Sequence, residues 1–278
     1  MLTDPIELVA SARAAGRGVG AFNVIQVEHA EAFAEAAERA GCGLVMQISQ
    51  NAAKYHGSLA PIALATLAVA RESSAPIVVH LDHAEDRALV TQAIALGMNS
   101  VMYDGSKLDY AANVAATAEV VREAHAAGVS VEAELGEVGG KDGVHAPGVR
   151  TRPSEAVDFV GATGVDALAV AVGTSHAMTE RTASLDLDLI RELRAAIRVP
   201  LVLHGSSGVP DDELTRAVEA GMTKINISTH LNKTMTAAIA AFMSAQPGIV
   251  DPRKYLGAGR SAMVDEVVRL LGVLKATR

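Results

Sequence analysis

Three histidines in this sequence stand where imidazole side chains could bind a metal ion together. His83 ends the motif HLDH, His176 ends GTSH, and His204 follows the apolar run LVL. The chain has one cysteine, Cys42, so a cysteine-rich zinc site and an internal disulfide are both excluded. A lone histidine is usually an ordinary core or surface residue, but three at the ends of apolar runs favour a metal site. Three protein ligands with a fourth position for substrate is the usual arrangement of catalytic zinc.

The stretch VVHLDHAED (78–86) places several titratable groups at the end of one apolar run. Side chains in a strand alternate between its faces, so His80 and Asp82 share a face and His83 falls at the turn. We therefore expect His83 to be the metal ligand, and His80 to be a hydrogen-bonded residue of the interior. Asp82 could either orient a ligand or transfer protons, and the spacing leaves both roles open.

Two further carboxylates, Asp104 and Glu134, also end apolar runs. They could form a second cation position, or they could pair with lysine and arginine. His145 lies in a glycine-rich loop, GEVGGKDGVHAPG, which is typical of a mobile lid or an irregular connection. Three other histidines are expected on the surface of helices or loops: His29, His56 and His125.

A second group of polar residues suits phosphate. The motif LHGSSGVP supplies small residues before a helix expected to start near Pro210, and KINIST ends the last apolar run. Backbone N–H groups at such helix starts bind phosphate. The candidate residues are Gly205, Ser206, Ser207, Asn226, Ser228 and Thr229, with Asn23 and Ser49 at the ends of the first two runs.

These residues are positioned by a recurring unit, in which a short apolar run is followed by a polar tip and an alanine-rich helical stretch. The eight runs are GVGAFNV (18–24), GLVMQIS (43–49), PIVVHLD (76–82), NSVMYD (99–104), VSVEAEL (129–135), VDALAVAVG (165–173), VPLVLHG (199–205) and TKINIS (223–228). Near-continuous apolar strands predict a parallel sheet that is covered on both sides.

Eight such units predict an α/β fold, a single-domain (β/α)8 TIM barrel over residues 1–278, with an extra C-terminal helix in 251–278. An open doubly wound sheet is the alternative. It is disfavoured because no GxGxxG motif follows the first strand. In a barrel, the carboxyl ends of all strands meet on one face, so the polar tips above should converge.

Composition limits the partners. The 278-residue chain has a net charge of −8, which argues against nucleic acid or an anionic membrane as its main partner. We find no signal-peptide pattern and no uncharged apolar run of about 18 residues. The expectation from these features is a soluble, cytoplasmic protein.

At these residues the sequence resembles the class II, zinc-dependent ketose-bisphosphate aldolases, which include fructose- and tagatose-bisphosphate aldolases. The resemblance rests on HLDH, VEAELGEVGG, GTSH, LVLHGSSG and KINIST, in the same order and spacing from AFNV to DPRKYLG. It implies reversible cleavage of a phosphorylated ketose, foremost fructose 1,6-bisphosphate, to dihydroxyacetone phosphate and an aldehyde. It also implies a homodimer or homotetramer.

The resemblance further implies a role for each candidate residue. His83, His176 and His204 would hold the catalytic Zn²⁺, which polarises the substrate ketone. Asp82 would take the proton of the C4 hydroxyl during cleavage. Asp104 and Glu134 match a secondary metal position, Asn23 and Ser49 lie near the dihydroxyacetone part, and Gly205, Ser207, Asn226, Ser228 and Thr229 match a phosphate cradle assisted by a monovalent cation.

The sequence departs from the family pattern in three places. Asp142 stands where the family usually has a loop glutamate that exchanges a proton with the substrate carbon. Ala177 replaces a glycine after His176, and His230 replaces an acidic residue. The resemblance also implies an arginine that contacts the far phosphate, and Arg260 is the candidate for it. One alternative is an aldolase for another sugar, tagatose bisphosphate or a deoxy-keto-sugar phosphate. A second, motivated by Asp142 and Ala177, is a non-catalytic sugar-phosphate binder derived from this family. A third, from the metal site alone, is a barrel metallohydrolase.

Overall fold

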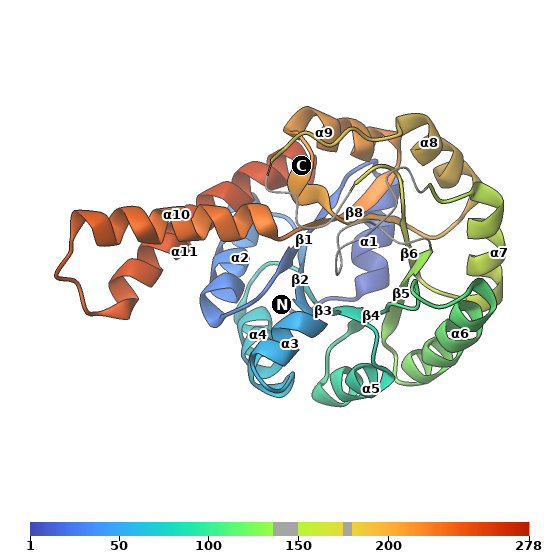
Figure 1. Ribbon diagram of the computed structural model, residues 1–278, viewed down its shortest axis with the longest axis horizontal. Helices are drawn as coiled ribbons and strands as arrows, with labels where there is room; N and C mark the ends of the chain where they lie inside the picture. Colours follow the sequence, from blue (N-terminus) through green and yellow to red (C-terminus); the bar gives the residue numbers. More distant parts are fainter. Residues whose placement is uncertain (136–149, 175–179, 278) are drawn as a thin grey trace.

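The computed structural model describes residues 1–135, 150–174 and 180–277. In these residues, eight parallel strands pair in chain order, and β8 pairs with β1 to close a barrel (Figure 1). The strands are β1 (Val19–Asn23), β2 (Leu44–Ser49), β3 (Ile77–Ala84), β4 (Ser100–Tyr103), β5 (Ser130–Leu135), β6 (Ala167–Val170), β7 (Leu201–Leu203) and β8 (Met222–Ile227). The expected TIM barrel is confirmed, and the open sheet is wrong.

Helices alternate with the strands and cover the outside of the barrel (Figure 1). They are α1 (Pro5–Ala14), α2 (Val27–Ala40), α3 (Gln50–Tyr55), α4 (Ala60–Glu72), α5 (Arg87–Leu96), α6 (Tyr110–Ala126), α7 (Pro153–Thr163), α8 (Leu187–Ala196), α9 (Asp211–Ala220), α10 (Thr229–Ala245) and α11 (Pro252–Val273). Side-chain caps start many of them; Asp86, for example, accepts from the Ala88 N–H. Glycines such as Gly41, at a φ of 64°, end them in the left-handed conformation.

Two layers of apolar packing hold the barrel. The larger core lies between strands and helices and contains the fully buried Phe22, Phe33 and Phe159. A smaller cluster inside the barrel contains Val45 and Val78. Helix α1 precedes the first strand and closes the amino end of the barrel, where its residues line a small cavity together with interior side chains. The opposite end, at the carboxyl ends of the strands, carries the polar residues.

The chain continues past β8 into two long helices that pack on each other and, through α11, on α2. The distal part of this α10–α11 pair projects away from the barrel (Figure 1). The extra helix expected in 251–278 is thus α11. Among the helices of the described ranges, none is both long and apolar enough to span a lipid bilayer.

Candidate active site

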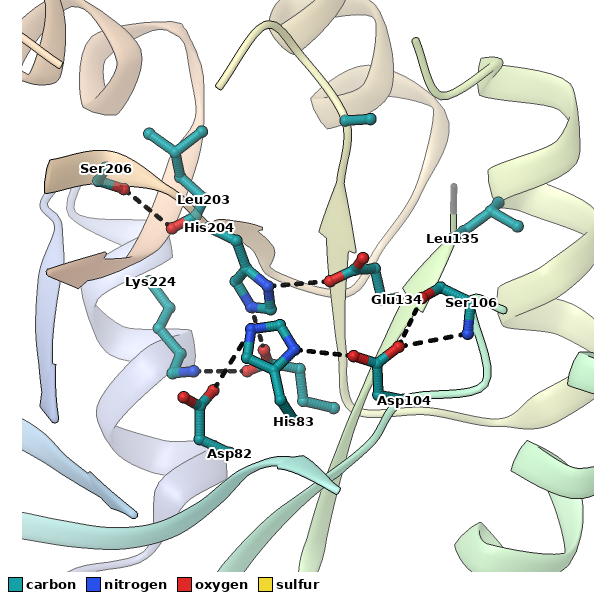
Figure 2. A network of polar contacts seen from close by, with 12 residues as sticks. Asp82, His83, Asp104, Ser106, Glu134, Leu135, Leu203, His204, Ser206 and Lys224 are labelled. Atoms are coloured by element: carbon teal, nitrogen blue, oxygen red, sulfur yellow. Dashed lines mark hydrogen bonds and ion pairs between the residues drawn. The ribbon is translucent and has the colours of Figure 1, made fainter. Parts of the chain in front are cut away.

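His83 lies at a break in the ladder at the end of β3. The pairing of β3 with β4 shifts between Leu81 and Ala84, and His83 has a φ of 50°, a left-handed conformation that is rare for a non-glycine residue. Such backbone is retained mainly at functional sites. The break frees His83 from strand alternation, as the sequence predicted. Its Nδ1 lies 2.8 Å from Asp104 Oδ2, and Ser106 Oγ donates to the other oxygen of Asp104 (Figure 2).

His204 follows β7 and is completely buried between two glutamates of β5. Its Nδ1 lies 3.0 Å from Glu134 Oε2, and its Nε2 lies 2.9 Å from Glu132 Oε1. Burial alone would lower the pKa of His204, but the hydrogen bonds to Glu132 and Glu134 outweigh it and raise that pKa to about 9. The rings of His83 and His204 meet edge to face at 4.5 Å (Figure 2).

Asp82 sits beside these histidines with one oxygen held and one oxygen unbonded. Asn23 Nδ2 donates to Oδ2 at 2.9 Å, and Gln47 Nε2 contacts the same oxygen at 3.4 Å. Oδ1 is buried, accepts no hydrogen bond from a described residue, and lies 3.9 Å from His83 Nε2. Burial raises the pKa of Asp82, but the electrostatic effect of His83 and Lys224 outweighs burial and lowers that pKa to about 2, so the carboxylate is ionised at neutral pH.

The barrel interior below these residues holds a second charged pair. Lys224 Nζ donates to Glu132 Oε2 at 2.8 Å, and both side chains are buried. His80 Nδ1 lies 2.7 Å from Ser100 Oγ. Burial and the charge of Lys224 lower the pKa of His80 to about 3, so it is neutral. The prediction that His80 is a hydrogen-bonded residue of the interior is confirmed.

The two loops expected to bind phosphate are tied together. Gly205 has a φ of 66°, which lets the chain turn directly after His204. Ser207 Oγ accepts from the N–H groups of Ser228 and His230, at 3.2 and 3.3 Å, and so joins the loop after β7 to the start of α10. Ser206 Oγ instead donates to the Leu203 carbonyl, so its hydroxyl hydrogen is not free to bind a phosphate oxygen.

The remaining predicted site residues are more loosely connected. The buried Asn226 Oδ1 has no hydrogen-bond partner in the described part of the chain and is available to a ligand. Ser49 Oγ caps α3 by accepting from Ala52, which leaves its hydroxyl hydrogen to donate. Thr229 begins α10. The predictions for Asp142, His145, His176 and Ala177 fall on residues outside the described ranges.

A metal ion fits this arrangement. Ligand atoms of Asp82, His83 and His204 lie within 4.8 Å of one another, and so do those of His83, Asp104 and Glu134. Imidazole and carboxylate donors suit a divalent transition metal. The unbonded, buried Oδ1 of Asp82 is a sign that the site takes a further group, a cation or a substrate hydroxyl, since a buried carboxylate oxygen is costly without a partner.

The comparison with known families decides what kind of protein carries this site. A family model described as fructose-bisphosphate aldolase class-II matches residues 3–278, almost the whole chain. The chain belongs to the class II aldolases. It is therefore a carbon–carbon lyase of a metal-dependent family, and the metallohydrolase alternative is wrong.

Individual relatives align with this class II aldolase in sequence or structure over nearly their full lengths. The fructose-bisphosphate aldolase of Thermus caldophilus is 38% identical, with 97% of this chain and 96% of that protein covered. The crystal structure of the YdjI aldolase from Escherichia coli K12 matches with a TM-score of 0.87 at 28% identity, covering 99% and 98% of the two chains. The fructose-bisphosphate aldolase of Campylobacter jejuni, at 21% identity and a TM-score of 0.81, supports the fold alone.

Three polar residues of the aldolase barrel were given no role by the sequence analysis: Gln47, Glu132 and Lys224. A signal for them exists, because strand alternation puts Gln47 on the face of Ser49, Glu132 on that of Glu134, and Lys224 on that of Asn226. A lysine inside a buried strand is itself a signal, because lysine is almost never fully buried unless it is paired.

One of the expected surface histidines is buried. His29 is wrong as a surface residue; it is buried on α2, the helix on which α11 packs. His125 is exposed as expected, and its Nε2 lies 2.8 Å from Asp166 Oδ2.

Arg260, the candidate for the far phosphate, instead bonds Glu31 and Glu35 of α2 within the chain. Asp104 and Glu134 contact the histidines in addition to any cation they could bind.

Proposed function

We propose that this class II aldolase cleaves fructose 1,6-bisphosphate to dihydroxyacetone phosphate and an aldehyde, and catalyses the reverse condensation. The main support for this proposal is the cluster of Asp82, His83 and His204 at the carboxyl end of the barrel. Their ligand atoms lie within 4.8 Å of one another. We assign zinc to His83, His204 and, by resemblance, His176. A bound Zn²⁺ supplies a Lewis acid that polarises the ketone of the substrate.

Asp82 is the proposed acid and base at C4 of the substrate. Its pKa of about 2 keeps it ionised at neutral pH, ready to accept the proton of the C4 hydroxyl during cleavage and to return it in condensation. Asn23 and Gln47 hold Oδ2, so Oδ1 is the oxygen left to act on the substrate. By resemblance, Asp142 exchanges the proton at the neighbouring carbon.

Phosphate recognition is assigned to the joined loops after β7 and β8. Support comes from the Ser207 hydroxyl, which aligns both loops at the start of α10, where backbone N–H groups favour an anion. The cradle consists of Gly205, Ser206, Ser207, Asn226, Ser228 and Thr229, with Asn23 and Ser49 toward the dihydroxyacetone part. Asp104 and Glu134 are the proposed second cation position, with ligand atoms within 4.8 Å of those of His83.

The assembly proposed by resemblance is a homodimer or homotetramer of this single domain in the cytoplasm. Exposed apolar side chains on the distal part of the α10–α11 pair, such as Met243 and Val250, support self-association through this arm. Light scattering of the purified protein at several concentrations tests this proposal, and a monomer at all concentrations would contradict it.

A coupled triose-phosphate assay tests the reaction. The substrates are fructose 1,6-bisphosphate, tagatose 1,6-bisphosphate and deoxy-keto-sugar phosphates, each with and without a chelator. We expect the highest kcat/KM with fructose 1,6-bisphosphate, loss of activity with the chelator, and recovery with Zn²⁺. Preference for another sugar would reassign the substrate, and calorimetric binding without turnover on every sugar would show a binder.

A further inference from the structure

The buried pair of Glu132 and Lys224 is not explained by the proposed reaction, because neither residue lies in the group of candidate ligands. The side chains are 3% and 5% exposed and lie inside the barrel, next to a small cavity also lined by His80 and Ser100. A buried ion pair is weak evidence for stability, since apolar residues of similar volume often serve as well. A role at the neighbouring site is therefore the more informative explanation.

Glu132 uses its two oxygens on two different partners. Oε2 accepts from Lys224 Nζ at 2.8 Å, and Oε1 lies 2.9 Å from Nε2 of His204. His80 does not compete for Glu132, because its Nε2 is 3.9 Å away and its Nδ1 contacts Ser100. Glu132 is thus held between a fixed positive charge and one ring nitrogen of His204.

The two ring nitrogens of His204 face different surroundings. Nε2 faces Glu132 and, through it, Lys224 in the barrel interior. Nδ1 faces Glu134, which belongs to the metal-competent group with His83 and Asp104 (Figure 2). An imidazole that binds a metal is neutral, with one N–H and one lone pair, so a carboxylate that holds the N–H of one nitrogen leaves the other nitrogen to the metal.

We propose that Glu132, anchored by Lys224, is a positioning residue that holds the Nε2–H of His204 and so directs Nδ1 toward the metal. This inference rests on the proposed function, in which His204 is a zinc ligand. Carboxylates that accept the second N–H of a ligating histidine orient the ring and raise its basicity, and their loss weakens metal binding about 10- to 100-fold. Here Lys224 stabilises the ionised carboxylate in a buried position.

Two double variants separate hydrogen bonding from charge. E132Q/K224M removes both charges but keeps a side-chain oxygen for Nε2–H, whereas E132M/K224M also removes that oxygen. Zinc affinity is measured by competition with a chelator of known affinity, and folding is followed by the thermal unfolding midpoint of the metal-free protein. D166N is the matched control, because Asp166 makes a similar contact with His125, 2.8 Å from Nε2, and contacts no candidate ligand.

We expect E132M/K224M to bind zinc about 10- to 100-fold more weakly than the wild type, E132Q/K224M to lie between them, and D166N to match the wild type. Wild-type affinity in both double variants would overturn the inference. Equal weakening in both would also overturn it, because charge alone would then matter. E132Q/K224M against the wild type decides the question if the methionine variant does not fold.

The failure of the proposed function gives a different result. If the wild type binds no zinc, or if H204A binds zinc as tightly as the wild type, His204 is not a ligand and the site assignment itself is wrong. If only H204A loses zinc while the Glu132 variants keep it, the site assignment stands and the positioning role fails.

Discussion

Replacing Lys224 by methionine should destabilise the metal-free protein strongly, because Lys224 is the buried partner of Glu132. The variant removes the ammonium that lies 2.8 Å from Glu132 Oε2 and leaves that oxygen of the buried carboxylate unpaired, with His204 on Oε1 as the remaining partner. Removing one partner of a buried ion pair costs about 3–5 kcal/mol. Unfolding entropy of about 2.1 cal/mol/K per residue, over 278 residues, converts this to a thermal midpoint about 5–9 °C lower.

Differential scanning calorimetry after chelation measures this change, since bound metal would add its own stabilisation. The matched variant is E132Q/K224M, which leaves no unpaired charge and should recover most of the lost midpoint, to within about 2 °C of the wild type. A K224M midpoint within about 2 °C of the wild type would refute the reasoning, because Glu132 would then not depend on Lys224. A double variant no more stable than K224M would refute it equally.

The remaining predictions concern the site and the single thiol. D82N should retain zinc but lose about 10²–10⁴-fold in kcat, measured with metal content in the same samples; unchanged turnover would remove Asp82 from the chemistry. S207A should raise KM more than it lowers kcat, because the hydroxyl joins the phosphate loops; an effect on kcat alone would contradict this. Burial raises the pKa of Cys42 to about 11, so the native thiol should react slowly with a maleimide at pH 8 and quickly once unfolded; equal rates would argue against burial.

The sequence by itself determined which end of the barrel carries the candidate catalytic and metal-binding side chains. Repeated apolar runs predict a closed parallel barrel, and closure brings the carboxyl ends of all strands together. His83, His204 and Asp82 could therefore be predicted to converge, although 121 positions separate the two histidines in the chain. The departure of His83 from alternation was likewise readable, because it follows the last residue of the apolar run.

Only the tertiary structure decided which inward side chains meet. Alternation places Glu132 and Lys224 inside the barrel, but their contact spans 92 positions and depends on strand register and on the reach of both side chains. The burial of His29 was equally hidden, because His29 lies against Asn232 of α10, a helix about 200 positions further along the chain. Periodicity in a sequence specifies the face of each element, whereas partners across a barrel are set by packing among elements distant in the chain.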